Sequence, residues 1–159
     1  MSITTEPTAK WEQNETLINE AANKLADCGL KPSLIDAMAK GVAGLQVGCH
    51  RLAVQSGWWT EHDEMPEQYR KYFLGTKIAL IHSETSELLE GNRKGRADDH
   101  LPHRPAEEVE AADILIRLMD YCGKRGFDLS GAVIEKLAYN QQRPDHKPEN
   151  RAAEGGKGF

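Results

Sequence analysis

The chain has no long hydrophobic run and no excess of basic residues, and these two absences exclude several classes of function. No stretch approaches the roughly 20 apolar residues that a membrane-spanning helix needs, and residues 1–7 have neither the basic start nor the apolar core of a signal peptide. The formal net charge is −5, whereas a protein that coats nucleic acid needs a basic face. We therefore expect a cytoplasmic protein with neither a membrane nor a nucleic-acid polymer as partner.

Cysteine is also scarce. Cys28, Cys49 and Cys122 are odd in number and show no C-x-x-C spacing, so the sequence predicts neither a disulfide framework nor a zinc site. All three lie in segments with helical apolar periodicity, where we expect them to act as small buried apolar side chains.

Strand patterns are missing, and helical patterns take their place. No segment of useful length alternates polar and apolar residues with a period of two. Apolar residues recur at helical spacing in segments near 11–27, 33–55, 67–90, 106–125 and 128–142. Gly126 is expected to end the fourth helix and Asp128 to cap the fifth. The expected fold is an all-α bundle of about five helices, a single domain over 11–143 between a flexible lead-in (1–10) and a polar, mobile tail (144–159).

The second predicted helix carries three glycines near four-residue spacing, Gly41, Gly44 and Gly48. Glycine weakens a helix, but a row of glycines permits close packing against another helix. We expect this row to be a contact surface between copies of the chain.

Four carboxylates stand at matching intervals on two consecutive predicted helices. Glu84 and Glu87 are spaced i, i+3 on the third helix, and Glu110 and Asp113 have the same spacing on the fourth. Each pair therefore lies on one face of its helix. If the helices pack antiparallel, the four carboxylates converge beside apolar residues and repel one another unless cations neutralise them. Oxygen ligands of this kind favour Mg²⁺ or Mn²⁺, which usually bridge to phosphates, so we expect a polyphosphate substrate.

This arrangement resembles a known family. An E-x-x-E motif, a spacer over residues 88–109 and an E-x-x-D motif are similar to the signature of the MazG-type all-α nucleoside triphosphate pyrophosphatases. Residues 80–90 and 110–117 are similar to the two metal-binding helices of the family, and residues 135–144 resemble the Lys/Asn/Arg stretch that follows in many members. The segment Gly57-Trp58-Trp59 is similar to one in compact phage and bacterial members. The resemblance covers roughly residues 45–145.

The resemblance implies hydrolysis of a (deoxy)nucleoside triphosphate to the monophosphate and pyrophosphate, with dGTP or GTP as the expected substrate in nucleotide-pool control. Its metal ligands carry over to Glu84, Glu87, Glu110 and Asp113, which would hold two or more Mg²⁺ ions per site, with Mn²⁺ able to substitute. Glu87 is the expected catalytic base. Compact members assemble, so a homodimer or a homotetramer is expected, working in the host cytoplasm if a phage encodes the chain.

Three polar residues of the fifth predicted helix are expected to bind the phosphates and the sugar. Lys136, Asn140 and Arg143 are spaced i, i+4, i+7 and so share one face. Lysine and arginine suit phosphate oxygens, and Asn140 suits a phosphate or a sugar hydroxyl. Without the neighbouring motifs, Lys136 and Arg143 would be interpreted as ordinary charges near a helix C-terminus.

Four residues are candidates for binding the base. Trp58 and Trp59 have the flat rings that stack on bases, with a role in the core or in a dimer contact as the alternative. Gln46 and His50 share one helix face and could read base edges.

Three other functions compete with a guanine-selective enzyme. A broad-specificity house-cleaning pyrophosphatase would use the same carboxylates. A di-iron carboxylate bundle would need a Glu-x-x-His motif from each of two helices, and this chain has none within a convincing helix. A non-catalytic helical interaction protein would use its acidic face to bind a basic partner.

Overall fold

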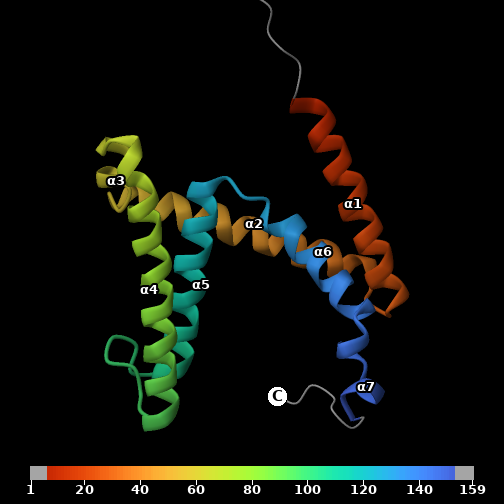
Figure 1. The fold of residues 1–159 in the computed structure, drawn as a ribbon. Coiled ribbons are helices and arrows are strands. Elements are labelled where there is room, and N and C mark those ends of the chain that lie inside the picture. Colours follow the sequence, from red (N-terminus) through yellow and green to blue (C-terminus); the bar gives the residue numbers. More distant parts are fainter. Residues whose placement is uncertain (1–6, 153–159) are drawn as a thin grey trace, which may run out of the picture. The chain divides into compact units, whose positions relative to one another are not determined.

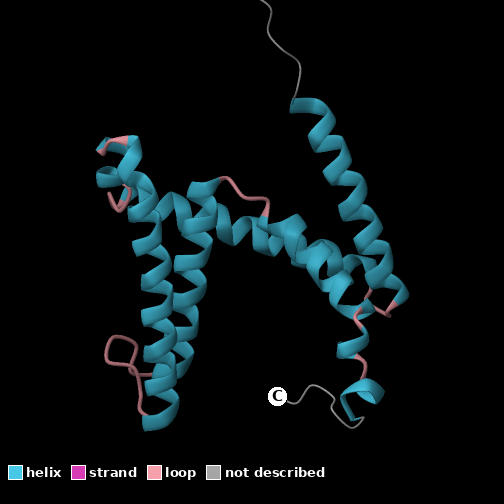
Figure 2. Ribbon diagram, viewed as in Figure 1, coloured by secondary structure: helices cyan, strands magenta, loops and turns pink. Residues whose placement is uncertain are grey.

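The structure, a computed structural model, describes the backbone of residues 7–152 and the side chains of residues 14–152. Within this range the regular structure is helical, apart from one isolated β-bridge between Ala97 and Pro105 (Figures 1 and 2). The predicted all-α fold is thereby confirmed. None of the described helices is long and apolar enough to cross a membrane.

Seven α-helices follow one another along the described chain. They are α1 (Pro7–Asp27), α2 (Pro32–Gln55), α3 (Thr60–Glu64), α4 (Glu67–Lys94), α5 (Ala106–Arg125), α6 (Leu129–Gln142) and α7 (Pro148–Ala152), with a 3-10 turn at Pro144–His146. The five predicted segments correspond to α1, α2, α4, α5 and α6. The two short helices were not predicted, because a helix of five residues has too few apolar positions to show a period. Residues 1–6 and 153–159 of the expected lead-in and tail lie outside the described residues.

The end of α4 differs from the expectation. The third predicted helix ends near Glu90, before Gly91, but α4 continues to Lys94 and ends at Gly95, whose φ is +60°. Gly91 is buried, and a Cβ there would lie 2.9 Å from the backbone nitrogen of Glu107. The glycine therefore allows α4 to approach the start of α5 closely, and it does not end the helix.

The junction between α5 and α6 follows the expectation. Gly126 ends α5 with a φ of +61°, as a left-handed C-terminal glycine should. The Oδ1 atom of Asp128 accepts a hydrogen bond of 2.9 Å from the backbone N–H of Gly131 and so caps α6.

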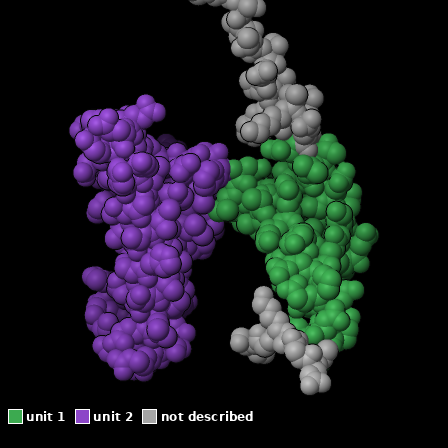
Figure 3. Space-filling view, in the orientation of Figure 1, with its two compact units in different colours: residues 1–43, 128–159 green, residues 44–127 purple. Residues whose placement is uncertain are grey.

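The chain divides into two compact units, which Figure 3 distinguishes by colour. Unit 1 comprises residues 1–43 and 128–159, and unit 2 comprises residues 44–127. In unit 1, α1 packs against α6 around a small core of aliphatic side chains, and the buried members are Ala21, Leu25, Ile35, Ile134 and Ala138. The expectation of one domain over residues 11–143 stays a prediction.

Unit 2 contains the second part of α2, then α3, and a long hairpin in which α4 and α5 run side by side (Figure 1). Its most deeply buried large side chain is Trp59, which is 1% exposed. The rings of His50, His62 and Phe73 surround this indole with centroid separations of 5.5 to 5.9 Å. The turn between α2 and α3 is therefore anchored in the core of the unit.

The cysteines only partly follow the expectation that all three are buried. Cys122 is buried and Cys49 is partly buried, but Cys28 is exposed. The reason is position, because Cys28 lies in the turn directly after α1, beyond the buried face of that helix.

Much of the predicted apolar face of α2 stays uncovered within the described chain. Leu45 and Leu52 are 48% and 65% exposed. A Cβ added at Gly41, Gly44 or Gly48 would meet no described atom of another element within 4 Å. The glycine row thus packs against nothing described here, and the expected contact between copies stays a prediction.

Candidate metal centre and adjoining cavity

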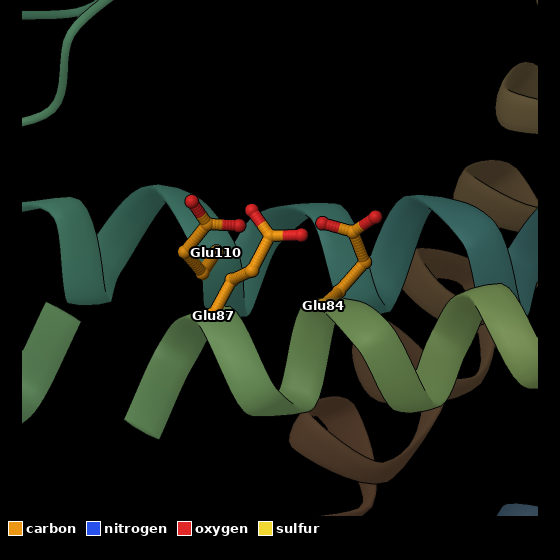
Figure 4. Close-up of side chains that lie close together, drawn as sticks. All are labelled: Glu84, Glu87 and Glu110. Carbon is orange, nitrogen blue, oxygen red and sulfur yellow. The ribbon is translucent and has the colours of Figure 1, made fainter. Parts of the chain in front are cut away.

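Three glutamates from the two helices of the hairpin meet in one group. Glu84 and Glu87 project from α4 and Glu110 from α5, and one carboxylate oxygen of each lies within 4.8 Å of the others (Figure 4). Glu84 is buried, Glu110 is half-buried and Glu87 is exposed. A group with this gradient of exposure is open to an ion or a substrate on one side.

The helix pairing explains why the three side chains converge. Glu84 and Glu87 are one turn apart on α4 and therefore share a face. One turn beyond Glu87 lies Gly91, which approaches the backbone of Glu107. Glu107 in turn precedes Glu110 by three residues on α5. The close approach therefore holds the two helices together beside the carboxylates.

The electrostatics of the group favour a bound cation. The pKa of Glu110 is raised, first by burial and then by the negative charges of Glu87, Glu84 and Asp113, and a hydrogen bond with Glu84 adds to the rise. Glu84 also forms an ion pair with Arg117, whose Nη2 lies 2.7 Å from Glu84 Oε1. A divalent cation would offset the remaining repulsion more completely than one arginine can.

Asp113 is not a member of this group of three, although the sequence predicted four converging carboxylates. It lies one turn after Glu110 on α5 and is near enough for its charge to raise the pKa of Glu110. It also lines a neighbouring cavity. The four predicted ligands thus occupy one region, with three of them in direct proximity. Oxygen donors without nitrogen or sulfur suit a hard ion such as Mg²⁺ or Mn²⁺.

A cavity of about 480 Å³ adjoins the carboxylates within unit 2. Its apolar side includes Leu52 and Ile116, and its polar side is formed by Lys77, Asp113, Arg117 and Asp120. Two lining residues interact with the carboxylate group, because Arg117 pairs with Glu84 and the charge of Asp113 acts on Glu110, so the cavity and the group are neighbours. Its volume is in the usual range for a small-molecule site.

The two tryptophans have different environments. Trp58 is 67% exposed and lines the cavity. Trp59 is enclosed, and its Nε1–H donates a hydrogen bond of 2.7 Å to Asp120 Oδ1. Trp59 therefore has the core role that was its alternative, and Trp58 remains the candidate for stacking on a base.

Gln46 and His50, the two other candidates for binding the base, form hydrogen bonds within unit 2. The Nδ1 atom of His50 lies 2.8 Å from Asp120 Oδ1, and the side-chain amide of Gln46 donates to the backbone oxygen of Phe127 at 2.7 Å. The cavity lining includes neither side chain.

Two lining residues, Lys77 and Asp120, were missed by the sequence reasoning. The spacing contains a signal for each of them. Asp120 follows Asp113 by seven residues and Lys77 precedes Glu84 by seven, and residues seven positions apart lie on the same face of a helix.

The predicted phosphate-binding residues lie on or beside α6, in unit 1, whereas the carboxylates belong to unit 2. The Nζ atom of Lys136 lies 4.6 Å from the centre of the Tyr139 ring, and the Nε atom of Arg143 donates to Asp145 Oδ1 at 2.9 Å. Asn140 has a buried Oδ1 atom without a hydrogen-bond partner. Their convergence on the carboxylate site stays a prediction.

Comparison of the chain with protein-family models, curated proteins and solved structures finds no match. The resemblance to MazG-type pyrophosphatases therefore rests on the motifs and their spacing. What the structure adds is the helical fold, the group of three glutamates and the cavity beside it.

Proposed function

We propose that the protein is a metal-dependent hydrolase of MazG type that converts a (deoxy)nucleoside triphosphate to the monophosphate and pyrophosphate. The observation that carries this proposal is the group of Glu84, Glu87 and Glu110, with carboxylate oxygens within 4.8 Å of one another beside a cavity of about 480 Å³. The group supplies ligands for cations, and the cavity supplies space for the organic part of a substrate.

The proposed metal ligands are Glu84, Glu87, Glu110 and Asp113, holding two or more Mg²⁺ ions, or Mn²⁺ as a substitute. When bound, such ions neutralise phosphate charge and lower the pKa of a coordinated water. Buried Glu84 and half-buried Glu110 suit a purely structural ligand role. Exposed Glu87 has the access that a base needs, so it would take the proton from the attacking water.

The proposed reaction is a simple hydrolysis. Water adds across the bridge between the α- and β-phosphates, the phosphorus–oxygen bond of that bridge breaks, and pyrophosphate leaves. Lys136, Asn140 and Arg143 would bind phosphate and sugar, as the resemblance implies. The preferred substrate would be dGTP or GTP, in control of a cytoplasmic nucleotide pool, and broad house-cleaning activity is the competing specificity.

Pyrophosphate release tests the proposal. The protein is incubated with each of the common ribo- and deoxynucleoside triphosphates in Mg²⁺, in Mn²⁺ and in a chelator, and pyrophosphate and orthophosphate are measured separately. We expect pyrophosphate with either metal and none in the chelator. Folded protein that releases no pyrophosphate from any nucleotide in either metal would overturn the proposal.

A homodimer or homotetramer is part of this proposal. The exposed apolar side chains Leu45 and Leu52 and the open glycine row on α2 support it. Light scattering at micromolar concentration is the test, and a monomer would contradict the proposed assembly.

A further inference from the structure

A stripe of charged side chains runs along the matching faces of α4 and α5 from the carboxylate group to the cavity. The stripe consists of Lys77, Glu84 and Glu87 on α4 and Glu110, Asp113, Arg117 and Asp120 on α5. Residues spaced by three or four positions share one helix face. The carboxylate group occupies one end of the stripe, and Lys77 and Asp120 occupy the other, in the wall of the cavity.

Asp120 is held in the cavity wall in a fixed orientation. Its side chain is 13% exposed, and two ring N–H donors hold it from the protein side. Trp59 Nε1 at 2.7 Å and His50 Nδ1 at 2.8 Å both bond to the same oxygen, Oδ1. Neither of these hydrogen bonds uses Oδ2, and Asp120 lines the cavity, so this second oxygen is available as an acceptor for a bound ligand.

Lys77 supplies a donor in the same wall. Its Nζ atom donates to the backbone oxygen of Trp58 at 3.2 Å and lies 4.6 Å from the centre of the Trp59 ring. Burial lowers the pKa of Lys77, while the nearby charge of Asp120 opposes this shift. Exposed Trp58 adds an aromatic surface to the lining. The cavity thus presents an acceptor, a cationic donor and a flat ring.

We propose that this cavity binds the guanine base of the substrate, with Asp120 accepting from the base, Lys77 donating to it and Trp58 stacking against it. Guanine carries two adjacent donors, N1–H and the N2 amino group, next to the acceptor O6. In adenine and cytosine, the ring nitrogen beside the amino group carries a lone pair and no hydrogen. A carboxylate that faces this edge accepts one hydrogen bond from the amino group and is repelled by the lone pair of the ring nitrogen. This inference rests on the proposed nucleotide hydrolysis and assigns its specificity to residues of unit 2.

The spacing along α5 fits one nucleotide. Asp120 follows Glu110 by ten residues, which is about 15 Å along a helix axis. The sugar and phosphates would occupy this interval, and Arg117 lies within it, paired with Glu84. His50 and Trp59 act through Asp120 and are positioning residues.

The substitution Asp120→Asn gives the sharpest test, because the geometry predicts a switch of specificity. The amide oxygen of asparagine can keep both bonds that Oδ1 makes, and its NH₂ group replaces the acceptor Oδ2 with a donor. Xanthine carries an oxygen where guanine carries its amino group. We expect kcat/KM for GTP to fall and the ratio of XTP to GTP hydrolysis to rise, by about 5- to 150-fold.

The matched control is Asp99→Asn, an exposed aspartate that pairs with Arg96, and it should leave the XTP to GTP ratio unchanged. A second measurement needs neither hydrolysis nor a folded variant. The binding of GMP, IMP and AMP to the unaltered protein is measured by the change in tryptophan fluorescence, and we expect GMP to bind most tightly. In a separate measurement, Lys77→Met should weaken the binding of GMP.

The outcomes separate the two proposals. Hydrolysis of all bases at equal kcat/KM, or an Asp120→Asn protein that loses GTP and XTP activity equally, overturns guanine recognition and leaves the hydrolase intact. GMP selectivity without pyrophosphate release from any nucleotide overturns the hydrolase and leaves the binding site. Equal binding of the three monophosphates overturns guanine recognition directly.

Discussion

The two ends of the charged stripe surround their carboxylates in opposite ways. Asp120 receives two hydrogen bonds from the rings of Trp59 and His50. Glu84, Glu87 and Glu110 face one another, and the pKa of Glu110 is raised by burial and by the charges around it. We call Asp120 the satisfied end, because its carboxylate has hydrogen-bond donors from the protein. We call Glu84, Glu87 and Glu110 the repelling end, because their carboxylates lie close to one another.

The difference teaches what each end is suited to bind. A carboxylate fixed by donors is a ready acceptor, whose position costs little to maintain when a ligand arrives. Carboxylates that repel one another are stabilised by a ligand of opposite charge. The same chemical group, a carboxylate, is therefore suited to two purposes, and its neighbours decide which.

Removing Glu87 should have the largest effect on the repelling end. Glu87→Gln keeps the shape of the side chain but removes a proposed metal ligand and the proposed base, so pyrophosphate release should fall by about 10²- to 10⁴-fold. Steady-state kinetics in Mg²⁺ measure this. The control is Glu90→Gln, one turn further along α4, whose partners are Arg93 and Lys94. Equal losses in both variants would refute a special role for Glu87.

Mg²⁺ should stabilise the folded protein by binding to Glu84, Glu87 and Glu110, and not by binding to Asp120. At a hundredfold excess over its Kd, Mg²⁺ should add about 2.7 kcal/mol to the free energy of unfolding. Thermal melting with and without Mg²⁺ detects this, and the gain should vanish in Glu110→Gln and persist in Asp120→Asn. A gain that survives in Glu110→Gln would place the ion elsewhere.

Breaking the satisfied end should cost stability. Trp59→Phe keeps a ring in the core but removes the Nε1–H donor to Asp120, and we expect a loss of about 1–3 kcal/mol in the free energy of unfolding. Urea denaturation measures it. Trp58→Phe is the matched control, because that ring is exposed. If both variants lose the same stability, Asp120 does not depend on the Trp59 donor.

The smallest expected effect is a dependence of stability on pH. The raised pKa of Glu110 means that the folded protein holds its proton to a higher pH than the unfolded chain does. Without metal, the free energy of unfolding should therefore fall as pH rises from the usual glutamate pKa through the raised one. Melting curves across mildly acidic pH reveal this slope. It should disappear in Glu110→Gln, and an unchanged slope there would assign it to another group.

The sequence predicted the long helices because their apolar periods are extended, and it located Gly126 and Asp128 because helix termini have specific chemistry. It placed the end of the third helix near Glu90, before Gly91, whereas α4 continues to Lys94, because a glycine that ends a helix and one that admits a neighbouring helix look alike in one dimension. The difference lies in a contact with Glu107, which only the folded chain reveals.

The site was predictable to a similar degree. Paired motifs of two carboxylates stand out in a sequence, so Glu84, Glu87 and Glu110 could be brought together in advance. For Asp120 the only signal was its spacing of seven residues from Asp113, and its fixed orientation depends on its hydrogen-bond partners. Those partners are His50 and Trp59, which are distant in the sequence and fixed by tertiary packing.

The contact between Gly91 and Glu107 has a consequence for the spacing of α4 and α5. A methyl group at position 91 would press on backbone atoms, 2.9 Å from the nitrogen of Glu107, so the two helices would have to separate. A hydrogen atom in place of a side chain thus keeps the backbones of the two helices close together beside the three glutamates, and any larger residue at position 91 would move the carboxylates of α4 away from Glu110.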